Sequence, residues 1–129
     1  MSDVVLDASA LLALVNDEPG AARVADVLAH TRISAFNFAE VVSHFVHAGM
    51  ATAAIDAMLS PLPIEVVPLD DGQSHIAERL RKVLAAAGLP EGALSCLALA
   101  QRDGLPVMTA DKLWRLIAGE ADVAIQVIR

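Results

Sequence analysis

Short runs of β-branched and aliphatic residues alternate with longer segments of helical periodicity along the whole chain. The segments expected to form strands are 3–6, 31–36, 64–68, 106–110 and 123–128. Strands that are separated by helices need crossover connections, so the alternation predicts a mostly parallel sheet with helices on both faces. The predicted fold class is therefore α/β, with a sheet of about five strands in a single domain over residues 1–129.

Helices are expected to fill most of the remaining sequence. They are predicted at 8–17, 18–30, 37–49, 51–59, 70–87, 90–104 and 111–117, with Gly104 ending the sixth. The third helix places five apolar residues on one face: Phe38, Val41, Val42, Phe45 and Val46. In open sheets of this kind, ligands bind at the carboxyl ends of the strands. Residues that directly follow the predicted strands are therefore the first candidates for a functional site.

Composition restricts what the chain can bind and where it can work. Hydrophobic residues make up 56% of the sequence and aromatic residues 3%, so we expect an aliphatic core. A net charge of −7 excludes a broad basic surface, so attraction to nucleic acid must be local or carried by metal. The single cysteine, Cys96, excludes an intramolecular disulfide. Asp3 stands where a signal peptide would be basic, and no apolar run could span a bilayer, so we expect a cytoplasmic protein.

Three acidic residues follow predicted strands. Asp7 interrupts the apolar run VVLDASALLALV, Glu40 lies near the start of the helix after the second strand, and Asp111 directly follows PVMTA. An ionised carboxylate in apolar surroundings is costly unless it is solvated, paired or bound to metal. Because the carboxyl ends of parallel strands share one edge, we expect the three carboxylates to converge. All-oxygen ligands of this kind favour Mg²⁺ or Mn²⁺ as the cofactor.

Helix capping is the alternative interpretation of the same acids. Aspartate is a preferred N-cap, so Asp7 and Asp111 can each cap the helix that follows. The segment NFAE has the spacing of a capping box, with Asn37 as the cap and Glu40 reaching back. The two interpretations compete, because a carboxylate bonded to its own helix amides is a poorer metal ligand.

Three segments resemble the PIN domain, in particular the VapC toxins of bacterial toxin–antitoxin modules: VVLDASALLALVNDEPGAARV, ISAFNFAEVVSHF and GLPVMTADKLW. The resemblance covers essentially the full chain and implies a compact three-layer α/β/α sandwich that commonly forms a homodimer. It also implies a Mg²⁺- or Mn²⁺-dependent ribonuclease, inhibited by a cognate VapB-type antitoxin. In such an enzyme Asp7, Glu40 and Asp111 would be the catalytic metal ligands, directly or through water.

The chain departs from this family at one acidic position. The family carries four acids, and alignment of Gly88, Gly92 and Cys96 places Ala93 where the third aspartate belongs. Glu91 lies two residues earlier, about 200° around a helix, and is not expected to replace it. Two explanations stay open: decay of the site, or deliberate replacement that disarms a toxic nuclease. One ion can still bind to the remaining acids, but we expect little or no RNA cleavage.

Other residues are candidates for supporting roles. The resemblance implies that the hydroxyls of Ser9 and Thr109 help to set the site, with local backbone capping as the alternative. Lys112 and Arg115 flank Asp111 and are expected to contact RNA phosphates. The ERLRK group is expected instead on the solvent face of its helix.

Two histidines share the polar face of the third predicted helix with an acid. His44 and His47 lie four and seven residues after Glu40, a spacing compatible with Zn²⁺. No cysteine or other histidine is placed to complete such a site, so exposed helix histidines are the simpler interpretation.

Other doubly wound proteins fit less well. A response-regulator receiver needs an acidic pair after the first strand, a haloacid-type phosphatase needs Asp-x-Asp, and a dinucleotide binder needs Gly-x-Gly-x-x-Gly. The chain has Asp7-Ala8-Ser9 at this point. The remaining alternative is a non-catalytic PIN-like scaffold that binds an antitoxin. Metal-dependent cleavage distinguishes the two, because both predict antitoxin binding.

Overall fold

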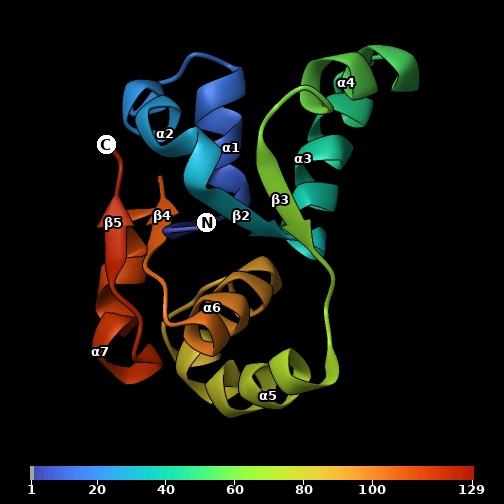
Figure 1. Cartoon of the computed structure of the whole chain (residues 1–129). Helices are drawn as coiled ribbons and strands as arrows, with labels where there is room; N and C mark the ends of the chain where they lie inside the picture. Colours follow the sequence, from blue (N-terminus) through green and yellow to red (C-terminus); the bar gives the residue numbers. More distant parts are fainter. Residues whose placement is uncertain (1) are drawn as a thin grey trace.

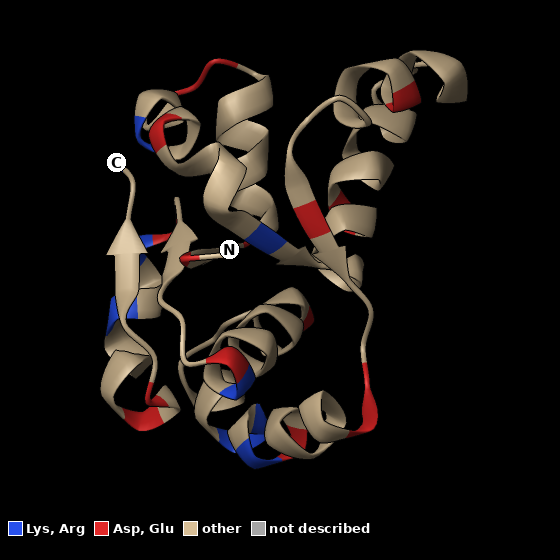
Figure 2. Ribbon diagram, in the orientation of Figure 1, with Lys and Arg blue, Asp and Glu red and all other residues tan. Residues whose placement is uncertain are grey.

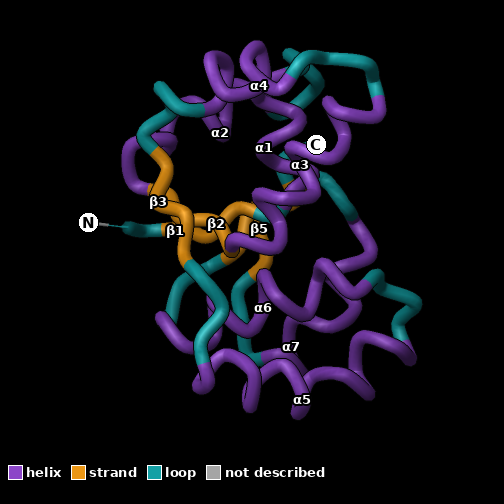
Figure 3. The backbone as a smooth tube through the Cα atoms, turned by 90° about the vertical axis from the view of Figure 1, so that its right-hand side faces the viewer, coloured by secondary structure: helices purple, strands orange, loops and turns teal. Residues whose placement is uncertain are grey.

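The computed structural model describes residues 2–129 and shows one five-stranded sheet between two layers of helices (Figures 1 and 3). The strands are β1 (Val4–Leu6), β2 (Thr31–Ser34), β3 (Ile64–Val67), β4 (Val107–Thr109) and β5 (Ile125–Val127). All four pairings are parallel, and the strand order is β3-β2-β1-β4-β5. The predicted parallel α/β sandwich is therefore confirmed.

The helices are divided between the two faces of the sheet. They are α1 (Ala8–Val15), α2 (Ala21–Val27), α3 (Ala35–His47), α4 (Thr52–Leu59), α5 (Asp71–Ala86), α6 (Glu91–Asp103) and α7 (Ala118–Ala121), with 3₁₀ helices η1 (Leu28–His30) and η2 (Lys112–Ile117). Figure 3 shows α1 to α4 on one side of the strands and α5 to α7 on the other. Over residues 2–129, no helix is both long enough and apolar enough to cross a membrane.

Alternate residues of the central strand supply the two halves of the core. Val4 and Leu6 pack with α1, α3 and α4, whereas Val5 packs with α5 and α6 on the opposite face. This follows from the period of two in a strand, which points successive side chains to opposite faces. Cys96 and Trp114 are buried in the part of the core between the sheet and α5 and α6.

Two expectations about the third helix are wrong. The helix begins at Ala35, because the Ser34 side chain accepts a hydrogen bond from the Asn37 amide and acts as the N-cap. Strand β2 consequently ends at Ser34 and does not reach residue 36. Val46 is 51% exposed, because it lies about 140° around the helix from the buried Val41.

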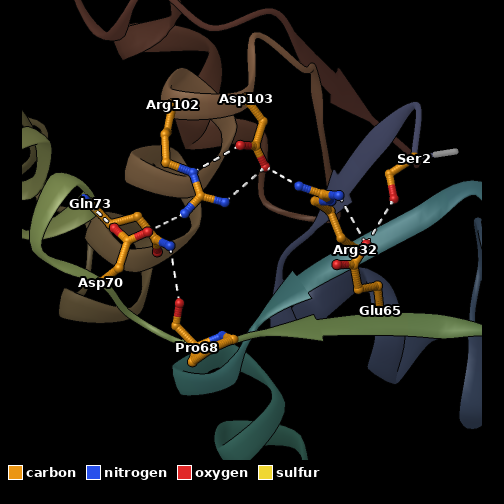
Figure 4. A network of polar contacts seen from close by, with 8 residues as sticks. All are labelled: Ser2, Arg32, Glu65, Pro68, Asp70, Gln73, Arg102 and Asp103. Carbon is orange, nitrogen blue, oxygen red and sulfur yellow. Dashed lines mark hydrogen bonds and ion pairs between the residues drawn. The ribbon is translucent and has the colours of Figure 1, made fainter.

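A chain of ion pairs fastens the edge of the sheet to the layer of α5 and α6 (Figure 4). Arg32 on β2 binds Glu65 on β3 at 2.9 Å and Asp103 at the end of α6 at 2.5 Å. Arg102 binds Asp103 at 2.9 Å and Asp70, the N-cap of α5, at 2.5 Å. Burial alone would raise the pKa of Asp103, but hydrogen bonds from Arg102 and Arg32 outweigh it and hold the pKa below its usual range. The Asp103 carboxylate therefore stays ionised and links two layers of the fold.

Removing that carboxylate should destabilise the domain. We expect Asp103→Ala to lower the free energy of unfolding at pH 7 by about 2 kcal/mol. The substitution leaves the half-buried Arg32 guanidinium without the more buried of its two carboxylate partners. Asp71→Ala is the control, because that side chain is 97% exposed beside His75 and should cost under about 0.5 kcal/mol. Urea unfolding measures both changes, and equal values for the two variants would contradict a structural role for the Arg32–Asp103 pair.

Candidate active site

The direction in which successive strands are added to the sheet reverses between β1 and β4. From β1 the chain continues outward to β2 and β3, then returns to β4 on the other side of β1. Ligands of open parallel sheets bind at such a switch point, beyond the carboxyl ends of the strands. Asp7 directly follows β1, and Asp111 lies two residues after β4. The topology therefore places one aspartate on each side of the switch point.

A cleft of about 350 Å³ opens at this point. Its polar and charged lining residues are Asp7, Ser9, Asn37, Glu40, His44 and Asp111, and its other lining residues include Leu12, Pro90, Gly92, Ala93 and Trp114. The three acids singled out in the sequence thus line one cleft, although 104 residues separate the first from the last. Within residues 2–129, no three His, Cys, Asp or Glu side chains form a group close enough to hold a metal ion as they stand.

Asp7 is the buried acid of this cleft. Its side chain is 5% exposed and accepts hydrogen bonds from the Ala10 amide at 2.9 Å and from the hydroxyls of Ser9 and Thr109, each at 2.7 Å. Burial raises the pKa of Asp7 to about 6 in spite of these hydrogen bonds, and the charge of Asp111 adds to the increase. No Lys or Arg of residues 2–129 forms an ion pair with Asp7, so its negative charge has no counter-ion among them.

Ser9 and Thr109 connect Asp7 to the turn that follows β4. The Ala110 amide donates to Ser9 Oγ at 2.9 Å, and the Asp111 amide donates to Thr109 Oγ1 at 3.1 Å. Because each hydroxyl already accepts from an amide, its own proton is free to point at the Asp7 carboxylate. Both hydroxyls therefore orient Asp7, while they also satisfy backbone amides, as the capping alternative supposed.

Glu40 does not take part in a capping box. It lies in the second turn of α3, and Asn37 Nδ2 donates to its Oε1 at 2.8 Å. The NFAE spacing correctly indicated that Asn37 and Glu40 interact. It also suggested Asn37 as the N-cap, but the N-cap is Ser34. The competition between capping and metal binding therefore does not arise for Glu40, whose carboxylate is exposed to the cleft.

Asp111 caps η2 and keeps one oxygen available. Its Oδ1 accepts from the Leu113 amide at 3.0 Å, whereas Oδ2 has no hydrogen-bond partner within residues 2–129. Lys112 and Arg115 lie on η2, are exposed, and form no ion pair with the described residues. Neither lines the cleft itself. Figure 2 shows other basic positions spread over α2, β2, α5 and α6.

Ala93 occupies the place in the cleft that the alignment assigns to a carboxylate. It is the third residue of α6, is 1% exposed and lines the cleft. Glu91 points away to α5, where it binds Arg81 at 2.8 Å. Glu91 therefore does not supply the missing acid, in agreement with the helical geometry.

Both histidines of α3 are exposed. His44 lines the cleft, whereas His47 Nδ1 donates to the Ser43 carbonyl oxygen at 2.7 Å. Both also line a second, shallower hollow together with Phe36 and Ser43. The sequence did not single out His44 as a residue of the acidic cleft.

The donor chemistry of the cleft fits a hard divalent cation. Carboxylate oxygens are the acidic donors, and hard ions such as Mg²⁺ and Mn²⁺ prefer oxygen ligands. Asp7 is buried and has no counter-ion within the described part of the chain. Burial raises the pKa of the Cys96 thiol, and the negative charges of Asp7 and Glu40 raise it further. A bound cation would offset this excess of negative charge.

The chain belongs to the PIN domain family, whose model matches residues 4–120. Its backbone is similar to that of DNA-bound VapBC from Salmonella typhimurium, with 19% identity, all of both chains covered and a TM-score of 0.72. A toxin-antitoxin complex from Klebsiella pneumoniae has 16% identity, 98% of each chain covered and a TM-score of 0.73.

A third similar structure has higher sequence identity. VapBC-5 from Mycobacterium tuberculosis, a member of the VapBC family of toxin-antitoxin systems, is 25% identical over all of this chain and 99% of that chain, with a TM-score of 0.63. No curated protein sequence matches the chain.

Proposed function

We propose that this protein is a VapC-type toxin whose cleft hydrolyses RNA phosphodiesters with Mg²⁺ or Mn²⁺, and that Ala93 impairs the reaction in this chain. The observation that carries the proposal is the Asp7 carboxylate, which is buried in a cleft that Glu40 and Asp111 also line and has no ion-pair partner among residues 2–129. Similarity of the fold supports the assignment to VapC-type toxins, since chains with a similar fold come from VapBC complexes.

Residues in and beside the cleft would have different roles in such a reaction. Asp7, Glu40 and Asp111 would hold the cation, which supplies an activated water and stabilises negative charge on the scissile phosphate. Ser9 and Thr109 keep the Asp7 carboxylate aimed into the cleft through their hydroxyl protons. Lys112 and Arg115 would bind the flanking phosphates of the RNA, because their charges have no carboxylate partner within the described residues.

Binding of Mn²⁺ is the first test of this assignment. We expect saturating Mn²⁺ to raise the Tm by roughly 5–10 °C, as a ligand present at about 100 times its Kd stabilises by about 2.7 kcal/mol. Glu40→Gln should remove most of the increase. Glu91→Gln is the matched control, because Glu91 is an exposed acid that points away from the cleft. Equal Mn²⁺ responses in the two variants would contradict a metal site at Glu40.

A VapB-type antitoxin and a second copy of the chain are the partners that we propose. Phe36 is 50% exposed and Leu69 59% exposed, and both line a small hollow against α5 and α6 that a homodimer contact would cover. We also propose a cytoplasmic location. The alternative function is a non-catalytic scaffold that binds the antitoxin. It is favoured if Ala93, which lines the cleft, stands at the position of a family acid, as the alignment predicts.

A further inference from the structure

The amide of Asn37 is held in one orientation. Asn37 is 2% exposed; its backbone amide donates to Ser34 Oγ at 3.0 Å, and the Ser34 hydroxyl donates to Asn37 Oδ1 at 2.5 Å. With Oδ1 turned to Ser34, both protons of Nδ2 point the other way. A flipped amide would set its oxygen against two acceptor oxygens, which is unfavourable. Ser34 therefore fixes the direction in which Asn37 donates.

The two protons of Nδ2 have two acceptors on different helices. One goes to Glu40 Oε1 on α3 at 2.8 Å, and the other to the Gly92 carbonyl oxygen in the first turn of α6 at 2.9 Å. Asn37 thus joins the start of α3 to the start of α6, and places the Glu40 carboxylate where these helices meet.

Gly92 provides the space for that carboxylate. A Cβ atom at position 92 would lie 2.5 Å from Glu40 Oε1 and 2.7 Å from Oε2, closer than any real contact. The Gly92 backbone is not in the left-handed region, so the feature that matters here is the absence of a side chain. A side chain at position 92 would push the Glu40 carboxylate away from its present place, where Asn37 Nδ2 donates to it.

We propose that Asn37 is a positioning residue for metal binding, acting through Glu40. An exposed glutamate on a helix ordinarily keeps its rotamer freedom, and fixing it costs conformational entropy. Glu40 forms no ion pair with the described residues, so the fold gains no salt bridge from holding it. Its confinement instead keeps an oxygen donor in the acidic cleft. The inference rests on the proposed function, because it assumes that the cleft binds a cation.

The test compares Mn²⁺ affinity in four proteins, measured by electron paramagnetic resonance of the free ion: wild type, Asn37→Ala, Glu40→Gln and the double variant. We expect Asn37→Ala to weaken binding roughly tenfold, since residues that orient a metal ligand commonly contribute 10- to 100-fold in affinity. If Asn37 acts through Glu40, the double variant should bind no more weakly than Glu40→Gln alone. Losses that multiply in the double variant would overturn the proposal.

Gln73→Ala is the control for loss of a buried amide. Gln73 is fully buried, is the third residue of α5 as Asn37 is of α3, and donates to the Pro68 carbonyl oxygen far from the cleft. It should lower the free energy of unfolding without changing Mn²⁺ affinity. Equal Mn²⁺ affinities of Asn37→Ala and Gln73→Ala overturn the inference and leave the proposed function standing. Absence of Mn²⁺ binding in wild type and in Ala93→Asp alike overturns both.

Discussion

Ala93→Asp is expected to give a metal-dependent ribonuclease. The new carboxylate would enter the cleft from the first turn of α6, where negative charge is favourable to the helix dipole. Metal ions contribute several kcal/mol to catalysis, and each 1.36 kcal/mol changes a rate tenfold, so we expect cleavage to rise roughly hundredfold or more. The measurement is cleavage of a pool of structured RNAs with Mn²⁺ and with a chelator.

The control for this experiment is Ala93→Asn, because asparagine has nearly the same shape as aspartate but carries no charge. It should leave cleavage and Mn²⁺ affinity unchanged, while Ala93→Asp should increase both. Without metal, Ala93→Asp should be less stable than wild type, because a further carboxylate joins Glu40 in the same cleft. An Asp variant with no gain in either metal affinity or cleavage would contradict the alignment at position 93 and favour the scaffold.

Asp7→Asn is expected to stabilise the metal-free protein near neutral pH. The pKa of Asp7 is about 6 in the folded chain and 3.8 as its ordinary value, so the folded state binds this proton more tightly. Its contribution to stability is complete below about pH 3.8 and is lost as the pH rises through about 6. About 2 pKa units correspond to about 3 kcal/mol, which is the upper size of the gain expected from a neutral amide at pH 7.5.

The same substitution should have the opposite effect when metal is present. Asparagine is as good an N-cap as aspartate, so α1 should keep its cap, but a neutral amide is a poor ligand for Mn²⁺. Urea unfolding of wild type and Asp7→Asn between pH 5 and 7.5, each with and without Mn²⁺, measures both effects. If Asp7 serves only as a cap, the variant will respond to Mn²⁺ as strongly as wild type does.

Local patterns were sufficient for most of the fold. The apolar run VVL is typical of a strand buried on both faces, and Gly104 ends α6 in the left-handed conformation that glycine favours. The end of β2 was predicted less well, because Ser34 and Asn37 are both good caps and the sequence does not say which one the helix uses. The exposure of Val46 depends on which neighbours reach α3, and periodicity alone does not specify them.

The alternation of strands and helices can be recognised in the sequence, and it predicts that Asp7 and Asp111 lie at one edge of a parallel sheet. This follows because crossover connections put the carboxyl ends of successive strands together. The surroundings of each acid, in contrast, depend on how the elements pack. Asp7 is desolvated by packing and held by Thr109, which is 102 residues away, and Glu40 is held by Asn37 beside Gly92. Burial and hydrogen-bond partners arise from contacts between distant segments, so no local pattern encodes them.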